Sequence, residues 1–409
     1  MKKKAANGNM KEMSMLLVLV LIIALFTITT GGKMLKPMNI GNLINQNAYV
    51  VILAVGMLLC ILTGGNIDLS VGSTVALIGA CAGTFIIVWH MNVYLAIFLC
   101  LLIGILIGMW QGFWIAYVGI PPFITTLSGM LVFRGATLLI LNGLTLNPFP
   151  DEFERLSTGF IPDIPVEVFG MKVNLICFFV GVLLALGFCA LQLINRGNRK
   201  KKGYELEDMG AMIAKMVITS AVIIGIFYLL SRNRGIPTVL IILGILLLVY
   251  NFFTQKTVRG RHLYAIGGNM KAAELSGVKT KQMMFFAYTN MSFIAAIAGL
   301  VFAARLNAAS PEAGKSFEMD AIASCFIGGA SAYGGTGTIM GALIGALIMG
   351  VLNNGMSLMG MSQNLQQVVK GLVLLLAVLL DVLSKKNISI RSLFGKVGGT
   401  KKTPEKGVI

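Results

Sequence analysis

Long runs of apolar residues, separated by short polar segments, make up most of this chain. A helix that crosses a membrane takes about 20 mostly apolar residues. Barrel strands would instead alternate between apolar and polar residues over about 10 positions, and these runs do not alternate. The pattern predicts an all-α polytopic membrane protein with about 10 to 12 transmembrane helices. The runs lie at 14–30, 47–62, 74–89, 93–118, 123–141, 173–194, 212–230, 236–253, 283–304, 338–354 and 367–383, and a shorter glycine-rich run at 321–332 either spans or re-enters.

Composition and charge fit this class. Hydrophobic residues make up 56% of the 409 residues and charged residues only 12%. The net charge of +17 could indicate a nucleic-acid partner, but the basic residues gather in short segments, as they do on the cytoplasmic side of membrane proteins. We therefore expect no nucleic acid and two cytoplasmic termini. The basic residues are Lys2, Lys3, Lys4 and Lys11; Arg196, Arg199, Lys200, Lys201 and Lys202; Lys256, Arg259, Arg261, Lys271, Lys279 and Lys281; and Lys385, Lys386 and Arg391.

This orientation divides the chain into three parts. A cytoplasmic tail covers 1–13, a transmembrane domain 14–383, and a second cytoplasmic tail 384–409. Within the domain, the basic loop 254–282 lies inside and the acidic loop 144–172 lies outside. No small-x-small cleavage pattern follows the first apolar run, so we expect an uncleaved anchor rather than a signal peptide.

Residues 63–73 place a carboxylate, hydroxyls and glycines between two apolar runs. A carboxylate between membrane-spanning runs must face protein or water. Glycines break a helix, and a broken helix is tolerated inside a membrane only where protein or a water-filled cavity covers it. Asn66, Asp68 and Ser70 are therefore candidates for a substrate pathway. Asp68 either caps a helix that starts at Leu69 or contacts the substrate.

Three more polar residues lie in apolar surroundings. Arg134, inside the run at 123–141, needs a partner or an aqueous cavity. Asn353 and Asn354 have donors and acceptors suited to the hydroxyls of a polar solute, so they are also pathway candidates. Hydrogen bonds between helices are an equally ordinary use of such amides.

The basic loop contains a short predicted helix. Gly267-Gly268-Asn269 is a turn in which the Asn can cap a helix. Ser276-Gly277 then ends that helix in the usual place for glycine. Such a helix either rests on lipid headgroups or contacts a partner.

The acidic loop runs against the basic balance of the chain. It carries Asp151, Glu152 and Glu154, and its prolines stiffen the backbone. These carboxylates are either ordinary surface charge or a docking surface for a soluble partner, where opposite charge steers the encounter.

The motifs together resemble one family. Residues 63–73 are similar to the signature Gly-x-Ile-Asp-Leu-Ser-Val-Gly of the sugar ABC-transporter permeases, the ribose, xylose and multiple-sugar group. The basic loop is similar to that family's coupling loop, which inserts into a groove of the ATPase. The resemblance covers nearly the whole chain except the two tails and 195–235. It implies a role in ATPase coupling for Gly267, Gly268, Asn269, Ala272, Ala273, Glu274, Ser276 and Gly277, with Glu274 standing where many relatives have Arg.

The resemblance also implies a function. The chain would be the permease subunit of a bacterial ABC importer in the cytoplasmic (inner) membrane, moving monosaccharides of the xylose, arabinose, galactose or glucose type. Two permease copies would form the pathway within membrane lipid, and ABC ATPase subunits would seat on the coupling loops. An extracytoplasmic sugar-binding protein would dock near Asp151, Glu152 and Glu154.

Several chemistries are not expected. The chain has no Gly-x-x-x-x-Gly-Lys-Ser/Thr loop for ATP, and its six cysteines show no metal-binding spacing. We expect no metal, no cofactor and no catalysis by this chain. The alternatives are an ion-coupled secondary transporter, which would need more intramembrane carboxylates than Asp68, and an ABC permease for nucleosides or branched-chain amino acids.

Overall fold

The computed structural model describes residues 2–168, 171–203 and 209–386, and these are mostly helical. Ten helices in this part of the chain are long and apolar enough to cross a membrane, and a shorter apolar stretch at Met15–Thr29 adds to them. The predicted polytopic all-α class is confirmed. The long helices are α1 (Lys2–Thr29), α2 (Pro37–Leu62), α3 (Val71–Gly83, continued by a π-helical turn at Thr84–Val88), α4 (Val93–Phe113), α5 (Pro122–Leu141), α7 (Leu175–Lys201), α8 (Met209–Ser231), α9 (Val239–Lys256), α12 (Thr280–Leu306), α14 (Ile339–Leu358) and α15 (Gln363–Lys386).

Short elements mark the two ends of the bundle. Helices α10 (Val258–Gly268) and α11 (Met270–Leu275) lie at one end, here the α11 end, where α1 begins and α15 finishes. Helix α6 (Asp151–Thr158) and the antiparallel strands β1 (Pro165–Val168) and β2 (Met171–Asn174) lie at the other, here the α6 end. The basic loop and the acidic loop are therefore at opposite ends of the bundle. The sequence pattern predicted the short helix α11 but neither α10 nor α6.

Helix α2 forms the centre of the core. Every residue from Asn47 to Leu62 is buried, and α12, α13, α14 and α9 pack around it. A helix that is apolar on all sides is stable in such a position. The helix begins at Pro37, before the apolar run at 47–62, because one side of its asparagine-rich first turns also packs against the protein. Asn39 and Asn354 of α14 exchange two amide hydrogen bonds there, at 2.9 and 3.1 Å.

Two segments cross the bundle as broken helices. Helix α12 ends at the α6 end, residues 307–316 turn back inside, and α13 (Phe317–Ile327) continues toward the α11 end, where α14 starts. With 11 residues, α13 is about 16 Å long, too short for a hydrocarbon core of about 30 Å. The run at 321–332 therefore belongs to a crossing made of a half that forms turns and a helical half. Likewise, the non-helical residues 63–70 lead from the α11 end of α2 into the bundle, where α3 begins.

Candidate functional site

Asp68 and Ser70 organise the start of α3. The Asp68 carboxylate oxygen Oδ1 accepts hydrogen bonds from the backbone N–H of Ser70 (2.8 Å) and from its hydroxyl (2.7 Å). Gln111 of α4 donates to the same hydroxyl at 2.6 Å. All three side chains are fully buried. The helix starts at Val71 rather than Leu69, so Asp68 closes an Asx turn ahead of the helix instead of occupying the cap position itself.

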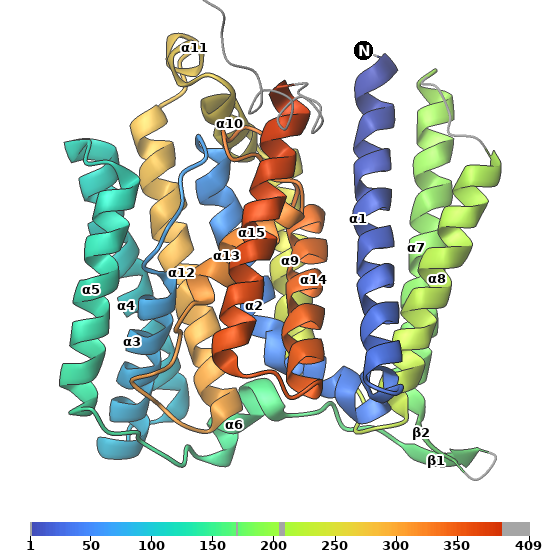
Figure 1. Cartoon of the computed structure of the whole chain (residues 1–409), viewed down its shortest axis with the longest axis horizontal. Coiled ribbons are helices and arrows are strands. Elements are labelled where there is room, and N and C mark those ends of the chain that lie inside the picture. Colours follow the sequence, from blue (N-terminus) through green and yellow to red (C-terminus); the bar gives the residue numbers. More distant parts are fainter. Residues whose placement is uncertain (1, 169–170, 204–208, 387–409) are drawn as a thin grey trace, which may run out of the picture.

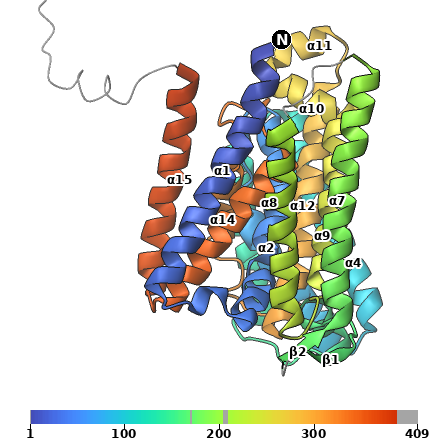
Figure 2. The ribbon, with the colours of Figure 1, turned by 90° about the vertical axis from the view of Figure 1, so that its right-hand side faces the viewer.

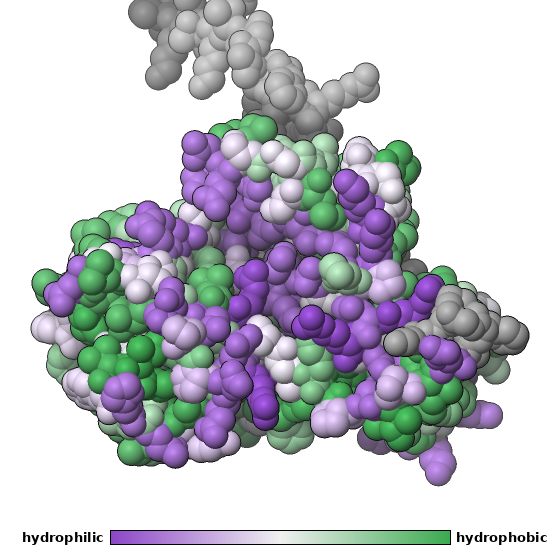
Figure 3. Space-filling model, turned by 90° about the horizontal axis from the view of Figure 1, so that it is seen from below, coloured by the Kyte–Doolittle hydropathy of each residue, from purple (hydrophilic) through white to green (hydrophobic). Residues whose placement is uncertain are grey.

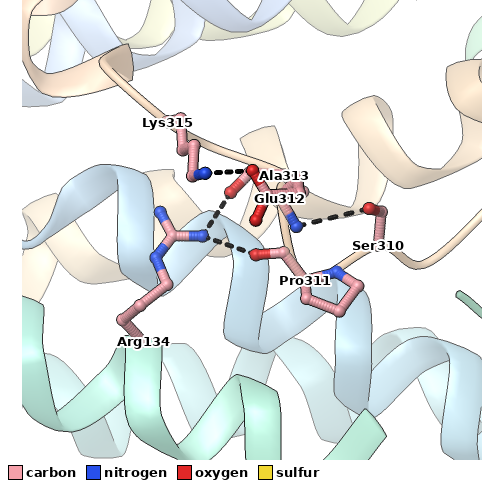
Figure 4. Close-up of polar contacts among 6 residues, drawn as sticks. All are labelled: Arg134, Ser310, Pro311, Glu312, Ala313 and Lys315. Carbon is pink, nitrogen blue, oxygen red and sulfur yellow. Dashed lines mark hydrogen bonds and ion pairs between the residues drawn. The ribbon is translucent and has the colours of Figure 1, made fainter. Parts of the chain in front are cut away.

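Arg134 holds the re-entrant residues 307–316. Its guanidinium donates to the backbone carbonyls of Pro311 (2.8 Å) and Ala313 (2.7 Å), as Figure 4 shows. Buried backbone carbonyls need such donors where the chain leaves helical structure. Next to them, Lys315 and Glu312 form an ion pair, with side chains that are 60% and 69% exposed. The partner that Arg134 needed is thus backbone rather than a carboxylate.

The starts of α3 and α13 meet inside the bundle. A Cβ atom on Gly72 would lie 2.2 Å from the carbonyl oxygen of Gly314 and 2.5 Å from a carboxylate oxygen of Glu318. Only glycine fits there, because real Cβ atoms do not approach so closely. Helix N-termini carry partial positive charge, and here two of them converge with the Glu318 carboxylate. Broken helices that present their N-termini inside a membrane are a common way to bind polar solutes.

A second polar group joins α13 to the edge of the bundle. Lys370 of α15 lies 2.9 Å from one carboxylate oxygen of Asp320 and 3.2 Å from the other. The hydroxyl of Tyr49 of α2 also donates to Asp320, at 3.0 Å. Asp320 is 1% exposed. Because α15 stands at the edge of the bundle (Figure 2) and packs mainly on α13, this pair fastens it there.

The predicted pathway residues are not all brought together. Asn66, partly buried, donates to the hydroxyl of Thr63 at 3.1 Å, close to Asp68 in the same segment. Asn354 instead pairs with Asn39 at the beginning of α2, and the buried Oδ1 of Asn353 has no hydrogen-bond partner within the described residues. Asp68 lies instead in the segment that follows the other end of α2 and leads to α3. The two asparagines therefore belong to the helix packing at the α6 end.

The short helix in the basic loop is present as predicted. The Asn269 side chain accepts the backbone N–H of Ala272 at 3.0 Å and caps α11. Gly277 follows with a φ of +84°, a conformation that favours glycine. Ala273 is buried, whereas Leu275 is 90% exposed. The two side chains therefore lie on opposite sides of α11, one against the protein and one toward solvent.

The acidic residues of the opposite end lie in the first turn of α6. Asp151 and Glu152 are exposed. Glu154 is instead tied to its own protein, because it accepts hydrogen bonds from Thr158 (3.1 Å) and from Asn307 (3.4 Å). Figure 3 shows this end from below, with hydrophilic residues across its middle and apolar residues toward its margins.

Sequence reasoning missed several of these contacts. Glu318, Asp320 and Lys370 are charges beside or inside apolar runs, so the cost of an isolated charge in a membrane was a signal that could have found them. Gly72 and Tyr49 carried no such signal, since their roles depend on segments that are distant in the sequence.

The fold defines a polytopic helical membrane protein with two broken helices that meet inside the bundle. The chain belongs to the family described as the permease component of branched-chain amino acid transport systems, whose model matches residues 39–378. It is 36% identical to the xylose transport system permease protein XylH of Haemophilus influenzae over 94% of this chain and 100% of that protein.

Two further relatives are also named as sugar permeases. The chain is 38% identical to the XylH protein of Escherichia coli, over 92% of this chain and 93% of the relative. It is 36% identical to the ribose import permease protein RbsC of Bacillus subtilis, over 92% and 94% of the two chains. No solved structure matches the chain. The protein is therefore a multi-pass protein of the bacterial cytoplasmic membrane.

Proposed function

We propose that this chain is the permease subunit of an ABC importer for monosaccharides, with xylose as the first substrate to test. The observation that carries the proposal is the match to xylose permeases over nearly the full length of both chains. The family description names branched-chain amino acids, but the relatives above are named for xylose and ribose. ATP hydrolysis would occur on partner subunits, and this chain would make or break no bond itself.

The sugar pathway would run along the face where the broken helices meet. Glu312 and Lys315 are exposed on residues 307–316, a segment that dips between membrane-spanning helices. Charges there must face water or protein rather than lipid. Carboxylate and ammonium groups also hydrogen-bond well to sugar hydroxyls. In this arrangement Asn66 would face the pathway, while Asp68 and Ser70 would hold the helix start behind it.

The α11 end would be cytoplasmic and would receive the ATPase. Support comes from the basic residues at this end, from the capped helix α11 and from the exposed Leu275. A short helix with one apolar side chain standing out fits a groove on a partner. At the opposite end, Asp151 and Glu152 would take part in docking of the sugar-binding protein, whereas Glu154 would stabilise α6. Two permease copies would enclose the pathway.

Reconstitution tests the function directly. We expect proteoliposomes that contain this chain, its ATPase and its binding protein to accumulate labelled xylose only when ATP is supplied to the ATPase side. Unlabelled xylose should compete, and leucine should not. Accumulation driven by a proton or sodium gradient without ATP would contradict the proposal and favour a secondary transporter. Competition by leucine alone would favour a permease for branched-chain amino acids.

A labelling experiment tests the orientation and the docking face. A cysteine placed at Glu152, with Cys189 replaced by serine, should react with a membrane-impermeant maleimide added to intact cells, because the other five cysteines are buried. Charge reversal at Asp151 and Glu152 should weaken binding-protein docking more at low salt than at high salt.

Glu154→Gln is the matched comparison for that experiment. Because Glu154 is bonded within the protein, its replacement should leave the salt dependence of docking unchanged. Protection of the cysteine at 152 in intact cells, with labelling only after lysis, would reverse the assigned orientation.

A further inference from the structure

Three glycine-containing segments pack against one another at the α11 end. They belong to the end of α10 (Gly267), the segment after α2 (Gly64 and Gly65) and the segment between α13 and α14 (Gly334 and Gly335). We call these five residues the glycine junction. Its members come from the predicted coupling loop and from both broken crossings.

The contacts within the junction are backbone to backbone. A Cβ atom on Gly267 would lie 2.0 Å from the carbonyl oxygen of Leu62 and 2.3 Å from the nitrogen of Gly335. A Cβ on Gly65 would lie 2.0 Å from the carbonyl oxygen of Ala332. Cβ atoms do not occur at such distances, so these contacts form only because Gly267 and Gly65 lack side chains.

Two hydrogen bonds hold the same three segments together. The backbone N–H of Gly335 donates to the carbonyl oxygen of Leu62 at 3.2 Å, and the Tyr264 hydroxyl of α10 donates to the carbonyl oxygen of Gly337 at 2.9 Å. Burial raises the pKa of Tyr264 above its ordinary value, so the hydroxyl keeps the proton that it donates. Dense contacts of this kind move as a unit rather than deforming gradually.

We propose that the glycine junction transmits motion of the coupling helix to the sugar pathway. This inference rests on the proposed function, since it takes α11 to be the ATPase contact. From the junction, residues 63–70 lead directly to the start of α3, and residues 331–335 begin four positions beyond Ile327, the end of α13. A shift of α10 and α11 therefore displaces both broken segments together. Gly267 is the positioning residue in this arrangement, because it lies against Leu62, which directly precedes the first segment, and against Gly335 of the second.

The structure separates Gly267 from its neighbour Gly268. A Cβ on Gly268 would meet no atom within 4 Å, so alanine there adds no contact within the protein. A side chain at 267 must push apart Leu62 and Gly335. Overpacking of this kind disturbs well-packed contacts, so we expect transmission through the junction to fall about tenfold.

The experiment follows motion at the pathway rather than transport alone. A cysteine is placed at Lys315, on the far side of the broken crossing, with Cys189 replaced by serine, and its rate of maleimide labelling is measured with and without ATP in the complete transporter. We expect ATP to change that rate in the otherwise unaltered protein. In Gly267→Ala the change should be lost and xylose uptake should fall about tenfold or more, while the ATPase still co-purifies and hydrolyses ATP.

Two further variants make the result decisive. Tyr264→Phe removes one hydrogen bond without a clash and should reduce the ATP-dependent change in labelling rate about two- to tenfold. This variant tests the proposal by itself if Gly267→Ala does not accumulate in the membrane. Gly197→Ala, on α7 with no atom within 4 Å of the added Cβ, is the matched control and should behave as the unaltered protein. A full ATP-dependent change in both Tyr264→Phe and any Gly267→Ala protein that accumulates would overturn the proposal. Failure of the unaltered chain to bind the ATPase would instead overturn the proposed function.

Discussion

Replacing Lys370 with methionine should remove most transport and destabilise the protein. The change leaves the Asp320 carboxylate, which is 1% exposed, without its cation inside the bundle. Removing one partner of a buried ion pair costs about 3–5 kcal/mol. Because the pair fastens α15 to α13, loss of the ion pair should directly disturb α13, the helical half of its crossing. Thermal unfolding of the purified protein and xylose uptake measure the effect.

Two further variants accompany this prediction: one that also neutralises Asp320, and one that removes a lysine elsewhere. Lys370→Met combined with Asp320→Asn removes the uncompensated charge, so it should recover part of the stability that the single change loses. Lys201→Met, at the exposed end of α7, should have little effect. Equal stability of the single and double variants would show that the pair does not hold α15.

Asp68→Ala should reduce xylose uptake about tenfold or more, whereas Asp68→Asn should keep much of it. Alanine leaves the buried N–H and hydroxyl of Ser70 without the acceptor that they share, and each unsatisfied buried donor costs about 1–3 kcal/mol. Asparagine keeps an oxygen at the same position. Its amide replaces the oxygen Oδ2, which has no hydrogen-bond partner within the described residues.

Uptake and membrane level of the two Asp68 variants, measured side by side, check this expectation. Similar loss in both variants would mean that the negative charge matters and that the turn before α3 is not the reason. Full uptake by Asp68→Ala would mean that transport needs neither the turn that Asp68 closes before α3 nor its negative charge.

Much of the fold was predictable because membrane insertion leaves a strong signal in sequence. Each apolar run gave a helix, and the capped helix after Asn269 followed from local turn chemistry. The beginning of α2 was missed because its asparagines look polar, and only their pairing with a residue on α14 reveals that they are inside. Local sequence cannot show such a contact.

The site was only partly predictable for the same reason. Asp68 and Arg134 were found because an isolated charge in a membrane needs an explanation. Asn353 and Asn354 carried a similar signal, yet Asn354 pairs with Asn39 at the α6 end. The contact of Gly72 with Gly314 and Glu318 joins segments that are about 240 residues apart in the sequence, so no window of residues could indicate it.

The shortness of α13 has a consequence for how the protein is made. A segment enters the bilayer from the insertion machinery when it is apolar and long enough to span, and a helix of 11 residues is not. Its exposed backbone ends would face lipid without hydrogen-bond partners. We therefore expect 307–338 to take its place only after α2, α12 and α14 are in the membrane and offer it a protein surface. Biogenesis of this chain would then include a late packing step, and variants that weaken the α13 contacts should be recognised by quality-control proteases before they reach a partner.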